Sequence, residues 1–399
     1  MKSPSYTLRI DGRQVENITQ ISIRFSMREL ADSWSASISD RVDLAPGARA
    51  ELAIEGRTVI VGELQNDRLV KRSGTRDRSI SGFSSARRLV KSSVIQPTRT
   101  IKDRSLRQIV EQIVEPFDMV VDVSESATTV ADEPIDKVKI GPNQNAVDFL
   151  NAICKRYGCI LVSGAASVDP DRKAKASVRI TRVGVRASPI PLVYPGVLAV
   201  DYENDVGNVH SSYLVNRKGK GLRDSDGTLR GLDGTATDAR VLYSPLIVQA
   251  QAGGTSQESL NIQAEMEMRK RAAEGQRVSI EVERWSPNNS QALWWPNTLY
   301  RFVDTEEGFD ETLLLSSVEL TQGSGGASAR LELLPPDAFA ILSDRELKVG
   351  RRTGRGGYRA NKEWLAQHSQ LVTAIANASD TVDYDKSKQD LIWKPADDA

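Results

Sequence analysis

Histidine and cysteine are scarce in this chain of 399 residues, which contains two of each. His210 and His368 lie far apart in the sequence, so histidine-based catalysis and histidine-rich metal sites are disfavoured. Cys154 and Cys159 have the spacing of neither a CxxC motif nor a disulfide framework. We expect both to be small buried apolar residues, because free cysteine is among the most buried residue types.

The sequence also lacks an excess of charge of either sign and any long apolar run. Its 53 Lys and Arg residues balance 53 Asp and Glu residues, so no long-range field draws the whole chain toward nucleic acid or an anionic membrane. No stretch reaches the roughly 18 consecutive apolar residues of a membrane span, and the first residues lack the apolar core of a signal peptide. We therefore predict a protein that is made in the cytosol and has no direct membrane insertion.

Alternating apolar and polar residues dominate the first part of the chain. Ile21, Ile23 and Phe25 alternate with serine and arginine, which is the period of a half-buried strand. The same period of two recurs at residues 34–38, 52–54, 59–61 and 78–83. Short strands at this spacing are typical of a barrel or sandwich, and we assign residues 1–90 to a first β-barrel domain.

The apolar period becomes helical near residue 100. Asp103 is placed to cap a helix whose apolar stripe comprises Leu106, Ile109, Val110, Ile113 and Val114. A second stripe lies within residues 146–157, where Asn143 or Asn145 can act as the cap. A short strand follows each predicted helix, so we predict an inserted α/β module over residues 91–188.

The β pattern returns over residues 189–343, which we assign to a second β-barrel domain. A helix interrupts it, and the capping box at residues 255–258 marks its start. The strands predicted at 312–316 and 330–334 are expected to be hairpin partners, because the glycine-rich residues 323–326 suit a turn between them.

A basic, glycine-rich linker and an amphipathic helix are predicted over residues 344–399. A terminal helix on such a linker favours docking on a partner or a neighbouring subunit. The predicted fold class is thus α+β and mainly β, with two β-barrel domains, an inserted small α/β module and a C-terminal helical extension.

Motifs for phosphate binding and for nucleophilic catalysis are missing from the sequence. Neither GxxxxGK[ST] nor GxGxxG nor GxSxG is matched. Asp201, Glu203 and Asp205 alternate along a predicted strand, and carboxylates crowd the turn at 304–311. A glycosidase needs two carboxylates, but carboxylates are also common on solvated strands and turns. We predict no enzyme activity and no catalytic, cofactor-binding or metal-binding residues, with a cell-wall hydrolase as the alternative.

Two groups of residues are candidates for contacts with other proteins. Trp294 and Trp295 are adjacent and point to opposite faces of a strand, so one can enter the core while the other is available to an interface. The other candidates lie in the predicted tail: Arg351, Arg352, Arg355 and Trp364. The basic segments can contact DNA phosphates or acidic protein surfaces, and the sequence leaves both open.

Three separated segments resemble one protein family. Residues 80–93, ISGFSSARRLVKSS, resemble the G-x-S-x-x-x-x-L-V-x-x-S signature of the late-control, baseplate-hub family of contractile phage tails. Residues 144–158, QNAVDFLNAICKRYG, look like a helix of that family, and residues 293–339 are similar to its last barrel strands. The Mu-like hub proteins are the branch that this chain resembles. Arg88 and Lys91 depart from the acidic residues expected there, which puts charge pairing at those positions in doubt.

The resemblance implies a structural baseplate hub in the virion, assembled in the host bacterial cytoplasm. It implies a homotrimer whose two barrels per chain form a pseudo-sixfold ring. Such a ring joins the central spike to the tail tube and other baseplate proteins, and leaves a channel for DNA in transit. The alternatives are a tail-associated peptidoglycan hydrolase and the hub part of a related contractile injection or secretion system.

Overall fold

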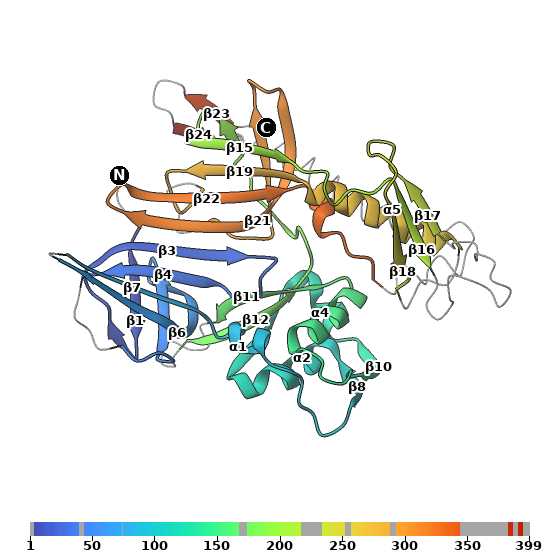
Figure 1. Cartoon of the computed structure of the whole chain (residues 1–399), viewed down its shortest axis with the longest axis horizontal. Helices are drawn as coiled ribbons and strands as arrows, with labels where there is room; N and C mark the ends of the chain where they lie inside the picture. Colours follow the sequence, from blue (N-terminus) through green and yellow to red (C-terminus); the bar gives the residue numbers. More distant parts are fainter. Residues whose placement is uncertain are drawn as a thin grey trace, which may run out of the picture.

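The computed structural model describes residues 4–39, 44–73, 75–166, 174–216, 234–251, 257–287, 293–343, 382–385 and 390–393. Strands make up most of the regular structure, and the helices are few (Figure 1). The predicted class, α+β and mainly β, is confirmed. The division of the chain at residues 90, 188 and 343 stays a prediction.

The first β region contains the alternating segments found in the sequence. Its strands are β1 (Tyr6–Ile10), β2 (Arg13–Gln14), β3 (Ile18–Ser26), β4 (Ser33–Ile38), β5 (Arg49–Ile54), β6 (Arg57–Arg72) and β7 (Thr75–Ser84). On β3, Ile21, Ile23 and Phe25 are buried, whereas the residues between them are half-buried or exposed. One face of this region therefore forms a core, as the period of two predicts.

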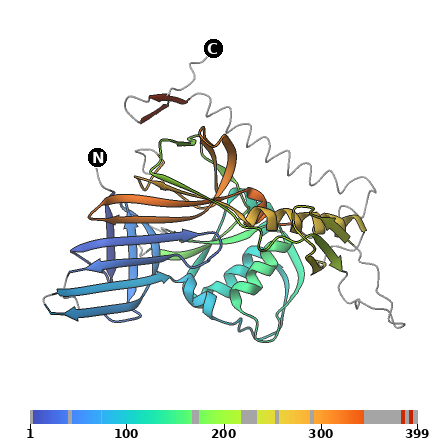
Figure 2. The ribbon, with the colours of Figure 1, turned by 45° about the horizontal axis from the view of Figure 1, so that its top comes forward.

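The α/β module follows, with its helices packed beside the first β region (Figure 2). Its elements are α1 (Ala86–Lys91), β8 (Thr100–Ser105), α2 (Leu106–Val114), β9 (Met119–Val123), α3 (Thr128–Ala131), β10 (Pro134–Lys139), α4 (Ala146–Arg156), β11 (Ile160–Ala166) and β12 (Lys175–Thr181). The predicted stripe of α2 is buried, and Asn145 caps α4. The cap predicted at Asp103 is wrong, because Ser105 accepts from Gln108 N–H and completes a capping box.

The second β region contains β13 (Arg186–Ala187), β14 (Leu192–Tyr194), β15 (Ala199–Asn204), β19 (Gln276–Val282), β20 (Thr298–Asp304), β21 (Phe309–Gly323) and β22 (Gly326–Leu334). The predicted hairpin is confirmed as β21 and β22, which pair through Gly323 and Gly326. Residues 255–256 of the predicted capping box lie outside the described residues. A separate small sheet packs on helix α5 (Gln257–Glu274) and consists of β16 (Ser212–Asn216), β17 (Gly234–Thr237) and β18 (Pro245–Gln249).

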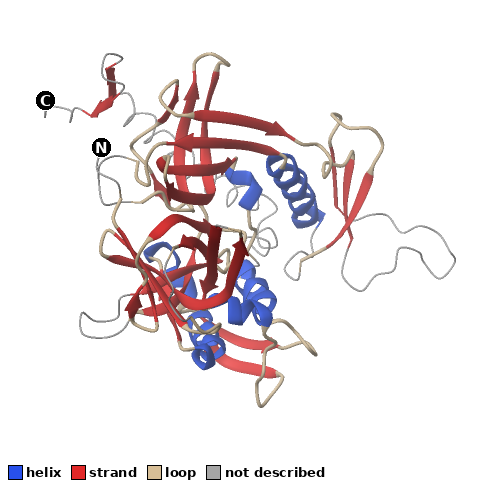
Figure 3. Cartoon of the chain, turned by 60° about the vertical axis from the view of Figure 1, so that its left-hand side comes forward, coloured by secondary structure: helices blue, strands red, loops and turns tan. Residues whose placement is uncertain are grey.

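The two β regions share one sheet, because β3 pairs with β21. This sheet has 14 strands. Its main path runs from β15 through β21 and β3 to β2 and is open, and β20 branches from β21 and pairs with β13 and β14. The two predicted barrels are therefore not closed among the described residues, because the edge of β3 that could close the first region is occupied by β21. A single apolar cluster contains buried residues of both regions. The helices lie beside and between the sheets (Figure 3).

The predicted basic linker and docking helix lie outside the described residues. From residue 344 onward, only β23 (Val382–Asp385) and β24 (Asp390–Trp393) are described, and they form an antiparallel pair that the sequence did not predict. In the described part of the chain, no helix has both the length and the apolar composition needed to cross a membrane.

Candidate functional site

Eight consecutive strands of the large sheet form a continuous antiparallel surface. Their order is β15-β19-β22-β21-β3-β4-β7-β6, and every neighbouring pair is antiparallel. Four of these strands come from each β region, and they lie in this order in Figure 1. We call this surface the eight-strand run.

One face of the eight-strand run carries mostly polar side chains, and every one of the eight strands contributes to it. Residues opposite each other on neighbouring strands share a face, so the pairing register decides which side chains meet. Ser35 of β4 lies opposite Ser22 of β3 and Ser81 of β7. The polar positions are Asp201, Glu203, Arg277, Ser279, Glu281, Arg330, Glu332, Ser317, Glu319, Ser22, Arg24, Ser26, Ser33, Ser35, Ser37, Ser79, Ser81, Asn66 and Arg68.

Hydrogen bonds and ion pairs connect this polar face from strand to strand. The Arg277 guanidinium lies 3.2 Å from Glu203 on β15 and 3.4 Å from Glu332 on β22. The Ser317 hydroxyl donates to Glu332 at 3.0 Å, which extends the chain of contacts to β21. Across the junction of the two β regions, the Ser22 hydroxyl donates to Glu319 at 2.8 Å. Acidic and basic side chains therefore offset each other locally.

The opposite face of the run is apolar, and Trp294 and Trp295 pack in the apolar cluster against it. The prediction that they point to opposite faces of a strand is wrong, because both precede β20 and contact the same core. Trp294 is buried, and its indole Nε1 donates to the Arg284 carbonyl at 2.8 Å. Trp295 is half-buried, and its ring centroid lies 4.7 Å from that of Phe25 on β3. Trp295 thus contacts the first β region from the second, within the same chain. The predicted roles of these tryptophans in contacts with other proteins stay predictions.

The other predicted interface residues, Arg351, Arg352, Arg355 and Trp364, lie outside the described residues. Sequence analysis missed a different exposed apolar pair. Leu242 and Tyr243, between β17 and β18, are 93% and 89% exposed. No periodic signal surrounds them in the sequence, so only the three-dimensional structure identifies them as exposed.

Several of the carboxylates considered for catalysis have structural partners, and Asp304 has three. Asp304 is buried, accepts a 2.6 Å hydrogen bond from the Tyr202 hydroxyl and also accepts from the Glu306 and Glu307 N–H groups. The hydrogen bond from Tyr202 lowers the pKa of Asp304 below its ordinary value. A general acid needs the opposite shift, because it must keep its proton near neutral pH. Among the described residues, no group of three His, Cys, Asp or Glu side chains could hold a metal ion.

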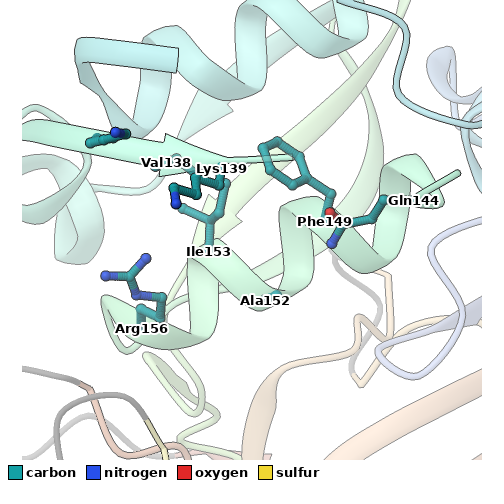
Figure 4. A pocket seen from close by; sticks show the side chains of 8 residues that line it. Val138, Lys139, Gln144, Phe149, Ala152, Ile153 and Arg156 are labelled. Atoms are coloured by element: carbon teal, nitrogen blue, oxygen red, sulfur yellow. The ribbon is translucent and has the colours of Figure 1, made fainter. Parts of the chain in front are cut away.

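A cavity of about 390 Å³ lies between β10 and α4 of the α/β module (Figure 4). It is lined by Lys137, Val138, Lys139, Gln144, Phe149, Ala152, Ile153 and Arg156. Phe149 and Ile153 supply an apolar floor, and three basic side chains surround it. The lining contains no carboxylate, histidine, cysteine or hydroxyl group, so this cavity lacks both the acid–base pair and the nucleophile of a hydrolase.

Family models match two segments of the chain. Residues 255–342 match the fourth domain of the Mu phage baseplate assembly protein GpP. Residues 86–166, which include most of the α/β module, match the second domain of the gp44-like baseplate hub protein. A search of curated proteins finds no match.

Solved structures share the fold over most of the chain. The 43 kDa tail protein of prophage MuSo2 from Shewanella oneidensis superposes with a TM-score of 0.70 at 21% identity, over 84% of this chain and 99% of that chain. A tail protein from Neisseria meningitidis gives 0.64 at 20% identity, over 84% and 99%. The prophage tail protein gp18 from Listeria monocytogenes gives 0.50 at 10% identity, over 82% and 94%.

The fold is shared with phage tail proteins, and the two matched domains are those of structural baseplate proteins. The resemblance predicted from residues 80–93, 144–158 and 293–339 is thereby confirmed. Within that class, the two matched domains are those of a Mu phage baseplate assembly protein and of a gp44-like baseplate hub protein.

Proposed function

We propose that three copies of this chain form a pseudo-sixfold ring that joins the central spike to the tail tube. In this ring each β region supplies one of six units around the axis. Closed rotational symmetry is the commonest way for identical chains to cover their exposed strand edges. The ring is assembled in the host cytoplasm and becomes part of the virion baseplate.

The pairing of β3 with β21 is the observation that carries this proposal. It joins the two β regions side by side through strand hydrogen bonds, so that a single chain already contains one lateral contact of the kind that a ring repeats. Each region contributes four strands to the run, and this equal contribution is what two equivalent units of a ring require.

In the proposed ring, the polar face of the eight-strand run lines the channel and the apolar face packs outward. Serine hydroxyls and locally offset charges give a hydrated wall without a strong field of either sign. A polyanion such as DNA can then pass without being held by a basic surface. We propose transit of DNA and no catalysis, since Asp304 holds a structural hydrogen bond and Glu203 an ion pair.

Mass measurement of the native particle by light scattering tests the ring. We expect a mass of three chains that persists on dilution, and a mass of one chain at every concentration would contradict the proposal. Cell-wall zymography tests the hydrolase alternative. Lysis that is lost in Asp201→Asn or Glu203→Gln, with wild-type folding retained, would replace the structural function with an enzymatic one.

A further inference from the structure

Strands β6 and β21 share a pattern of pairing with their neighbours. Each is long, and each shows a shift of pairing register near its middle, between Leu64 and Asn66 in β6 and between Leu315 and Ser317 in β21. Before the shift, one edge of β6 pairs with β5, and the corresponding edge of β21 pairs with β20. Beyond the shift, that edge of β21 pairs with β3.

The corresponding edge of β6 has no partner in the described part of the chain. Residues 65–72 pair with β7 on one side, and no strand is paired with their other side. At the far end of the eight-strand run, β15 pairs with β19 alone. The run therefore ends in two unpaired edges, and such edges are templates for pairing with another chain.

We propose that residues 65–72 of β6 in one copy pair with β15 of the next copy, as β21 pairs with β3 within the chain. This inference rests on the proposed ring and names the surfaces that close it. The run consists of two groups of four strands, β15-β19-β22-β21 and β3-β4-β7-β6. Strand β15 is the first strand of one group and β3 is the first strand of the other, so the two are counterparts.

Strand direction agrees with this pairing. Neighbouring strands of the run are all antiparallel, so the first and eighth strands point in opposite directions. The next copy is related to the first by rotation about the ring axis, so its β15 strand runs in the same direction along that axis as β15 of the first copy. The β15 strand of the next copy therefore meets β6 in antiparallel orientation, and the alternation continues through the junction.

The charges on the polar face are complementary at the two edges. Asp201 and Glu203 lie on the polar face at the β15 edge, and Arg68 lies on the same face at the β6 edge. Asp201 and Arg68 are both exposed. Within the chain, the equivalent junction places Glu319 of β21 opposite Arg24 of β3. The proposed junction repeats this acid–base match with the signs exchanged, which favours correct pairing of copies.

The apolar faces also match at the two edges. Leu198 and Tyr202 are 52% and 41% exposed at the β15 edge, on the face that is apolar elsewhere in the run. Leu69 is 42% exposed at the β6 edge, on that same face. Pairing of the two edges places these side chains next to each other and continues the core from one copy into the next.

Charge reversal tests the junction in the full-length protein. Asp201→Arg and Arg68→Asp each place like charges at every junction of the ring. We expect each to raise the concentration at which the particle dissociates by roughly tenfold, since cross-strand like charges are destabilising. The double variant restores opposite charges and should return dissociation to the wild-type concentration. Glu111→Arg, a charge reversal at an exposed position on α2, is the matched control and should leave the dissociation concentration unchanged.

Mass from light scattering across a dilution series separates failure of the junction from failure of the ring. A wild-type trimer that neither single reversal weakens would overturn the β15–β6 junction and leave the ring standing. A wild-type protein that stays at one chain would overturn both. Circular dichroism melts that match the wild type show that the reversed chains are folded, and rescue in the double variant excludes a folding defect as the cause of dissociation.

Discussion

Asp32 is an acidic residue buried where the first β region meets the α/β module. It is 5% exposed, its carboxylate accepts from the Ser163 hydroxyl of β11 and the Ser26 N–H, and its Oδ2 atom has no hydrogen-bond partner. Burial raises the pKa of Asp32 to about 7, because the charged form loses its hydration and both donors are neutral. The folded protein therefore prefers the protonated acid.

This shift makes the stability of the protein depend on pH. In the unfolded chain an aspartate has a pKa of about 3.9, roughly three units lower, which corresponds to ~4 kcal/mol. Between pH 4 and 7 the native state keeps a proton that the unfolded state has released. The free energy of unfolding therefore falls as pH rises through this window, and Asp32 adds no further change above pH 7.

Urea unfolding of the wild type and Asp32→Asn at pH 4.5, 6 and 8 measures this effect. The variant cannot titrate at this position, so its stability relative to wild type should increase by about 3 kcal/mol from pH 4.5 to pH 8. Arg78 and Lys175 lower the pKa values of their partners Asp67 and Asp118. These two residues therefore change the stability only below this pH window, and they do so equally in the wild type and the variant. Parallel stability curves for the two proteins would refute the assignment to Asp32.

Three further predictions concern the core, the thiols and the tail. Trp295→Ala removes the contact with Phe25 between the two β regions and should lower the free energy of unfolding by about 3 kcal/mol in urea titration; a loss below about 1 kcal/mol would show that this contact does not stabilise the sheet. Burial raises the pKa of the Cys154 and Cys159 thiols, so a thiol reagent should label neither in the native protein and both in urea, and rapid native labelling would contradict their burial. Deleting residues 346–399 should leave the ring folded but weaken docking to a tail partner in a pull-down, whereas aggregation of the shortened chain would assign that segment to the core.

Local patterns in the sequence predicted most of the individual elements. The α2 stripe from Leu106 to Val114 and the β3 alternation from Ile21 to Phe25 are buried as their periods require. The α2 cap shows the limit of local reasoning. Asp103 and Ser105 both precede the apolar stripe, and the hydrogen bonds that Ser105 exchanges with Gln108 identify the cap.

The candidate site could not be predicted to the same extent, because it depends on pairing between distant segments. The serines at 22, 33, 35, 37, 79 and 81 are visible in the sequence as the polar half of an alternation. Their convergence with Glu319 and Glu332 on one face follows from the pairing of β3 with β21, which lie almost 300 residues apart. No period within either segment encodes that neighbour, so the sequence predicted two separate barrels.

The two complementary, unpaired edges of the eight-strand run have a consequence for the kinetics of assembly. In the proposed ring, the second copy to arrive makes one edge contact, whereas the third makes two at once. Release of the last copy requires both contacts to break, so partial assemblies dissociate quickly and closed rings persist. Ring closure itself then acts as a proofreading step, because a damaged copy that offers only one competent edge leaves the particle before a spike or a tube can bind it.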